Sequence, residues 1–116
     1  MKGHPVPSAK ECRKARRMDL VCRLFFFGDD DFEGEAQVVD LSFSGCMARS
    51  MEPLMQGKRL KLSLFLPDGH AWPVRVDDAI IRWVRDCEFG LEFLSIRPPQ
   101  LHRIQQYMIR KRDMLS

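Results

Sequence analysis

The stretch KRLKLSLFL, residues 58–66, is the most regular part of the chain. Leucine occupies every second position from residue 60 to residue 66, and mostly polar side chains lie between the leucines. A period of two residues is typical of a β-strand with one buried side and one solvent-facing side. The segment Pro67-Asp68-Gly69 should end this strand in a tight turn, because proline fixes φ and glycine supplies the left-handed position.

Strand-like segments also occur on both sides of this stretch. Branched, aromatic or alternating apolar residues mark positions 18–27, 35–41, 46–48, 72–76, 79–85 and 89–93. Asp77 and Asp78 interrupt this pattern and indicate a bulge. After Pro98 and Pro99, which can begin a helix, apolar residues recur at helical spacing. Short strands at regular spacing, followed by one helix, favour a mostly-β fold: an antiparallel barrel with a C-terminal α-helix packed against it.

The length of 116 residues indicates a single domain. Hydrophobic residues make up 45% of the chain and charged residues 30%, so the composition is that of a globular protein that needs no disulfide or metal to fold. We expect a flexible tail over residues 1–9 and a domain over residues 10–116. Within that domain we expect a basic arm, a barrel and a helix, at residues 10–17, 18–95 and 98–114.

The charge is unevenly distributed along the chain. Five basic residues occur between Lys10 and Arg17, and five acidic residues occur between Asp29 and Glu35. The formal net charge is only +3, and no exposed mixture of aromatic and basic residues is visible, so the sequence does not favour nucleic-acid binding. A local basic cluster instead indicates a small anionic ligand.

Several other functional classes have no support in the sequence. There is no nucleophile elbow, HExxH motif, P-loop or plausible carboxylate pair, so we expect neither an enzyme nor a cofactor. The four cysteines form no CxxC pair and match no zinc spacing. The start of the chain, residues 1–10, lacks the apolar core of a signal peptide, and the longest apolar run, residues 24–27, is too short to span a bilayer. We therefore expect a cytoplasmic protein without membrane insertion.

The basic cluster contains an RxxxR motif at Arg13 and Arg17. Arginine presents a planar fork of donors that fits a phosphate group and also the O6/N7 edge of guanine. Two arginines four residues apart can therefore hold two groups of one ligand. The alternative interpretation is a solvated basic tail, because runs of like charge are usually solvated.

A second motif, DLSFSG at residues 40–45, follows the pattern DxSxxG at the end of a predicted strand. The Asp40 carboxylate can accept hydrogen bonds from guanine N1–H and N2–H, and the Ser42 hydroxyl can donate or accept nearby. Gly45 permits close approach of the backbone. The alternative interpretation is a plain turn in which Asp40 bonds its own backbone.

The order of these motifs resembles that of the PilZ family. RxxxR precedes DxSxxG by one strand–turn–strand unit, and three later stretches are similar to further family segments. They are LMQGKRLKLSLFL at residues 54–66, IIRW at 80–83 and FGLEF at 89–93. The resemblance covers roughly residues 11–109, which is nearly the whole expected domain.

The resemblance implies a six-stranded antiparallel β-barrel that binds cyclic dimeric GMP (c-di-GMP). Transferred by position, Arg13 and Arg17 would grip guanine edges and phosphates from the arm. Asp40 and Ser42 would bond a guanine edge from the barrel surface, and Gly45 would leave space for the base.

Three further residues are possible ligand contacts. Arg16 adds positive charge beside the arginine pair, although on a helical turn it would point away from it. Trp83 could pack beside a guanine or could serve packing at the barrel rim. Arg85, two residues later on the same strand face, could contact the ligand or be solvated.

The resemblance also implies how a signal would be passed on. Five basic residues with few apolar partners should leave the free arm mobile, and a ligand with two phosphates would order it over the barrel. A receptor without an output domain must act through a partner or through another copy of itself. We expect an effector protein in motility, pilus or polysaccharide machinery, with motility or biofilm formation as the regulated process. The alternative is a PilZ-like interaction module in such machinery that binds no nucleotide.

Overall fold

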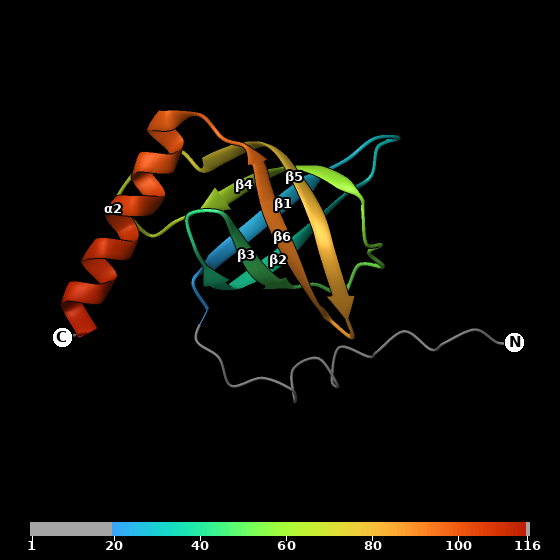
Figure 1. The fold of residues 1–116 in the computed structure, drawn as a ribbon, viewed down its shortest axis with the longest axis horizontal. Coiled ribbons are helices and arrows are strands. Elements are labelled where there is room, and N and C mark those ends of the chain that lie inside the picture. Colours follow the sequence, from blue (N-terminus) through green and yellow to red (C-terminus); the bar gives the residue numbers. More distant parts are fainter. Residues whose placement is uncertain (1–19, 116) are drawn as a thin grey trace, which may run out of the picture.

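Residues 20–115 are described by a computed structural model of the chain, which contains six strands followed by one helix in this range (Figure 1). The elements are β1 (Cys22–Phe27), β2 (Glu33–Leu41), β3 (Gly45–Arg49), β4 (Arg59–Phe65), β5 (Val74–Arg85), β6 (Glu88–Ser95) and α2 (Pro98–Leu115). All pairings are antiparallel, and the strands close into a barrel in the order β1-β2-β3-β6-β5-β4. The predicted fold class is therefore confirmed. The tail and the whole arm fall outside the described residues, so the division of the chain into parts stays a prediction.

The barrel interior is filled by the apolar side of each strand. In β4 the leucines at 60, 62 and 64 are buried, whereas Arg59 and Lys61 are exposed, as their alternation predicts. Phe26 and Phe89, both fully buried, meet edge to face with ring centroids 6.4 Å apart. Each such side chain contributes about 1.5–3 kcal/mol when it leaves water, so this interior is the main source of stability.

Register shifts at bulges change which side chains lie on the outer face. In the β2–β3 pair the register shifts between Val38 and Asp40. In the β5–β6 pair it shifts between Asp78 and Ala79 and again between Ile81 and Trp83. The predicted bulge near Asp78 is confirmed, and the strand continues through it: residues 74–76 and 79–85 of the two predicted segments lie in one strand, β5.

Helix α2 packs against β5 (Figure 1). Its Ile104 is fully buried in the core. Nε and Nη2 of Arg103 donate to the two carboxylate oxygens of Asp68 in the β4–β5 turn, both at 3.0 Å. The side chain of Asp68 is only 2% exposed and that of Arg103 is 13% exposed. The turn thus provides a buried anchor for the helix.

The charge state of Asp68 reflects this anchor. Burial opposes ionisation of its carboxyl group, but the hydrogen bonds from Arg103 and from the His70 backbone N–H, together with their charges, outweigh burial. The pKa of Asp68 is consequently held below its usual value.

The acidic β1–β2 turn lies at the opposite end of β2 from the β2–β3 turn (Figure 1). Asp30 and Asp31 both have left-handed backbone conformations, with φ of 59° and 60°. Two consecutive left-handed residues match the twist of a tight hairpin, where glycine or asparagine is usually preferred. The acidic segment is thus remote from the DxSxxG motif. No helix in the described part of the chain is long and apolar enough to cross a membrane.

Candidate ligand-binding site

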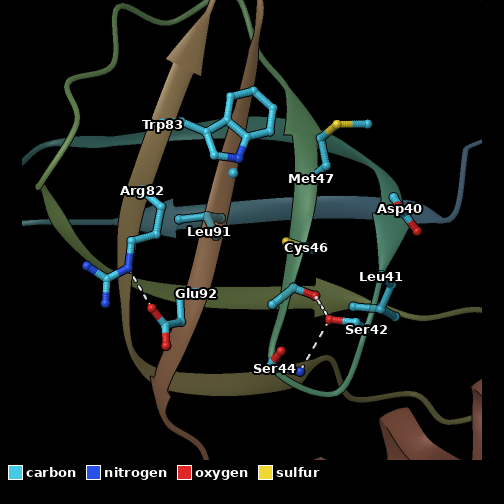
Figure 2. Close-up of a pocket in the computed structure, with 12 residues that line it drawn as sticks. Asp40, Leu41, Ser42, Ser44, Cys46, Met47, Arg82, Trp83, Leu91 and Glu92 are labelled. Atoms are coloured by element: carbon cyan, nitrogen blue, oxygen red, sulfur yellow. Dashed lines mark hydrogen bonds and ion pairs between the residues drawn. The ribbon is translucent and has the colours of Figure 1, made fainter.

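A hollow of about 410 Å³ lies on the outer face of the barrel, over β2, β3, β6 and β5 (Figure 2). The β2–β3 turn and these four strands contribute its lining: Asp40, Leu41, Ser42, Ser44, Gly45, Cys46, Met47, Arg82, Trp83, Gly90, Leu91 and Glu92. Three of the five residues that the motifs single out, Asp40, Ser42 and Gly45, therefore line one hollow, and Trp83 lines it too. The three arginines at 13, 16 and 17 lie outside the described residues.

The hollow is organised by a row of residues that crosses four strands. Asp40 pairs with Met47, Met47 with Gly90, and Gly90 with Trp83. The bulge in β2 after Val38 keeps the side chain of Asp40 on the outer face, where it is exposed. Glycine in the middle of the row leaves room for the neighbouring indole of Trp83, and the side chain of Met47 lies on the next strand (Figure 2).

The indole of Trp83 packs directly on Gly90, where a larger residue would leave no room for it. A Cβ atom added at Gly90 would lie 2.1 Å from the indole Nε1 of Trp83, so the indole occupies the space over this glycine. Trp83 is half-buried, and the guanidinium of Arg85 lies over its ring, 5.5 Å from the centroid. The sequence left two roles open for Trp83, packing at the barrel rim and contact with a guanine. The structure shows the packing role, because the indole lies against the barrel surface at Gly90. The residue also borders the hollow, so the ligand contact stays a prediction.

Close packing of β3 on β6 requires a glycine at position 45. A Cβ atom added there would lie 2.1 Å from the carbonyl oxygen of Leu91, a backbone atom that cannot move aside cheaply. Glycine at this position therefore allows β3 to lie close to β6 where β3 begins. The predicted role of Gly45, space for a base, is a separate matter that this contact does not test.

Ser42, and not Asp40, stabilises the turn of the DxSxxG motif. The Ser42 backbone N–H and hydroxyl both donate to the carbonyl oxygen of Gly45, at 2.8 and 3.1 Å. The Ser42 oxygen accepts from the Ser44 N–H at 3.3 Å. The Asp40 carboxylate accepts no hydrogen bond from any group within residues 20–115, so the alternative interpretation of Asp40 as the turn-forming residue is wrong.

The lining residues that were not predicted from the sequence include Met47, Arg82 and Glu92. Nε of Arg82 donates to a carboxylate oxygen of Glu92 at 2.5 Å across the β5–β6 pair (Figure 2). No local pattern marks these residues, because their proximity to Asp40 results from strand pairing between distant parts of the chain.

The ionisable groups of the lining have an excess of one negative charge, from two carboxylates and one guanidinium. Burial raises the pKa of the Cys46 thiol, and the nearby Cys22 and Asp40 raise it further. This thiol is therefore protonated and unsuited to act as a nucleophile. Within the described range, no cluster of metal-binding side chains occurs.

Comparison with known protein families agrees with this arrangement. The family model described as "PilZ domain" matches residues 11–110. The chain belongs to the PilZ family. PilZ domains are non-catalytic receptor domains and typically bind c-di-GMP, so family membership confirms the expectation that this chain is not an enzyme.

Among solved structures, the PilZ barrel is similar to that of the Bacillus subtilis inhibitor of motility, MotI/DgrA. The TM-score is 0.65 at 17% sequence identity, and the match covers 91% of this chain and 56% of the other chain. At this identity the likeness establishes the fold alone, and this chain spans little more than half of that relative's length. No curated protein matches the chain.

Proposed function

We propose that this PilZ domain is a c-di-GMP receptor whose ligand occupies the hollow beside the DxSxxG motif. The observation that carries the proposal is the exposed Asp40 carboxylate, which has no hydrogen-bond donor within residues 20–115 and lies in one row with Gly90 and Trp83. A carboxylate in that position can accept from N1–H and N2–H of guanine. The half-exposed indole of Trp83 offers an apolar wall for the base.

The charges of the hollow and of the basic arm suit different parts of the ligand. The lining of the hollow has an excess of one negative charge, which suits a neutral guanine better than a phosphate. The phosphates are therefore assigned to Arg13 and Arg17 of the basic arm, with Arg16 as an additional cation. Those arginines also have the donor geometry for a guanine O6/N7 edge.

The turn hydrogen bonds limit what Ser42 can do for a ligand. Its hydroxyl proton is directed at the carbonyl oxygen of Gly45, and one of its lone pairs accepts from Ser44. One lone pair remains, so in this geometry Ser42 acts on the ligand as an acceptor. Arg85 lies over Trp83, so we assign it a role in holding the indole rather than a direct contact.

Signal transmission in this proposal depends on the arm. Charge-assisted hydrogen bonds contribute about 1.5–3 kcal/mol each, and ordering a residue costs about 1–2 kcal/mol. Several such bonds offset the entropic cost of ordering the short segment 10–17. The ordered arm would then change a surface that an effector protein recognises. The effector is proposed to belong to motility machinery, because the similar MotI/DgrA structure is that of an inhibitor of motility. The cytoplasm is the proposed location.

Calorimetric titration of c-di-GMP tests the receptor assignment. The wild type should bind c-di-GMP and should not bind GTP or cyclic GMP comparably. Asp40→Asn and Arg17→Ala should each weaken binding about ten-fold or more, by loss of a charge-assisted bond. Asp29→Asn, which alters an exposed carboxylate in the remote β1–β2 turn, is the matched control and should bind like the wild type.

Absence of c-di-GMP binding by folded wild-type protein would refute the receptor assignment and favour an interaction module that binds no nucleotide. Hydrogen exchange tests the arm separately: c-di-GMP should slow exchange in residues 8–18. Unchanged exchange there with ligand bound would refute the ordering of the arm while leaving the receptor assignment intact.

A further inference from the structure

The second bulge of the β5–β6 pair alters the outer face of the barrel at the hollow. Ile81 is buried and pairs with Leu91, whereas Trp83 pairs with the next residue, Gly90. Arg82 therefore has no partner in the register, and both Arg82 and Trp83 place side chains in the lining of the hollow. Without the bulge, strand alternation would direct one of these two side chains into the core. Bulges often re-aim a side chain in this way next to binding sites.

Arg82 is held but keeps most of its hydrogen-bonding capacity. Its Nε donates to Glu92 at 2.5 Å, and this is its only hydrogen bond within residues 20–115. A guanidinium has five N–H donors, so the two terminal nitrogens of Arg82 still present four of them. The side chains of Arg82 and Glu92 are 55% and 45% exposed, which leaves the terminal nitrogens accessible to a ligand.

The ion pair between Arg82 and Glu92 presents the free donors of the guanidinium, while its two opposite charges largely cancel. Because the carboxylate of Glu92 neutralises the guanidinium, the pair attracts a negatively charged phosphodiester group weakly and suits a polar but uncharged partner. Guanine presents two acceptors side by side, O6 and N7, which an arginine fork can bind with two hydrogen bonds. Adenine presents N7 beside an amino group, and that amino group would oppose the arginine donors.

We propose that Arg82 is a specificity-determining residue that binds the O6/N7 edge of guanine, and that Glu92 is the residue that positions it. The inference rests on the proposed c-di-GMP receptor function and deepens it. Neither the RxxxR nor the DxSxxG motif contains these two residues. The assignment gives the hollow a guanine-reading group on β5, on the opposite side from Asp40 on β2.

The test measures binding of c-di-GMP and of cyclic di-AMP by calorimetry for the wild type, Arg82→Gln, Glu92→Gln and Arg23→Gln. The control residue, Arg23, makes the same kind of Nε contact with a glutamate, Glu35, at 2.8 Å, but on β1 and β2 outside the hollow. Arg82→Gln should weaken c-di-GMP binding about ten-fold or more and lower the preference for guanine over adenine by a similar factor. Glu92→Gln should shift both quantities in the same direction by less, and Arg23→Gln should shift neither.

Each outcome bears on a different claim. Unchanged c-di-GMP affinity and selectivity in a folded Arg82→Gln variant would overturn the inference alone. Equal weakening for both dinucleotides would also overturn it, because it would show a phosphate contact instead of a guanine contact. Absence of c-di-GMP binding by the wild type would overturn the proposed function, and this inference with it. Thermal melting of each variant, expected to match the wild type because both side chains are about half exposed, separates lost binding from lost folding.

Discussion

The buried pair between Asp68 and Arg103 should be a main determinant of how firmly helix α2 is attached. The perturbation is Asp68→Asn, which preserves the size of the side chain and its acceptor for the His70 N–H but removes the carboxylate charge. Arg103, only 13% exposed, would then lack its counter-charge. Removing one partner of a buried ion pair costs about 3–5 kcal/mol. Because asparagine retains one acceptor and Arg103 has some access to water, we expect about 2–3 kcal/mol.

The assay is urea unfolding together with thermal melting. For a domain of this size, about 4 °C of Tm corresponds to each kcal/mol, so the expected loss is roughly 8–12 °C. A double-mutant cycle with Arg103→Met isolates the pair itself, and a coupling energy of about 1.5 kcal/mol or more is expected. A coupling energy near zero, or a loss below about 0.5 kcal/mol for Asp68→Asn, would refute the view that this pair anchors the helix.

The pair also has a defined pH dependence. The pKa of Asp68 is lower in the folded protein than its ordinary value of 3.8, so the unfolded chain binds the proton more readily. The stabilisation is consequently present above that pH and is lost as the pH falls toward the folded pKa. The difference in unfolding free energy between the wild type and Asp68→Asn should therefore be present above about pH 4 and shrink below it.

Three further changes have expected outcomes. Asp31→Gly should raise the unfolding free energy by about 0.5–1 kcal/mol in urea titrations, because glycine relieves a left-handed conformation in a turn remote from the hollow; no gain would contradict this. Gly90→Ala should displace the indole of Trp83, lower stability by about 1–3 kcal/mol and change tryptophan fluorescence; an unaltered spectrum would contradict the contact. Ile104→Ala should cost about 2–5 kcal/mol in thermal or urea unfolding, because it removes the buried contact of α2 with the barrel; a change below about 0.5 kcal/mol would show that the contact is dispensable.

The secondary structure was accessible from the sequence because its signals are local. The alternation in residues 60–66 identified β4, and Pro98 identified the beginning of α2. The sequence predicted a bulge at Asp77 and Asp78 but left open whether one strand or two cross this region, and the structure shows one strand that continues through the bulge. The length of a strand depends on its partners, and those are distant in sequence.

The candidate site was only partly accessible for the same reason. Asp40, Ser42 and Gly45 form one short motif, so their proximity to one another was certain from the start. Arg82 and Glu92 join them through the pairing of β3 with β6 and of β6 with β5, and through a bulge that no local pattern specifies. Such residues become visible only when the register is known.

Closure of the barrel restricts how a partner can recognise this protein. Each of the six strands pairs with a neighbour on both sides along part of its length, so no strand within residues 20–115 forms the edge of an open sheet. Closure therefore leaves little backbone to which a partner could add a strand, a mode of recognition in which main-chain hydrogen bonds supply the affinity. Recognition then depends mainly on individual surface residues. A few substitutions on the outside of one unchanged barrel can therefore redirect it from one partner to another over evolution.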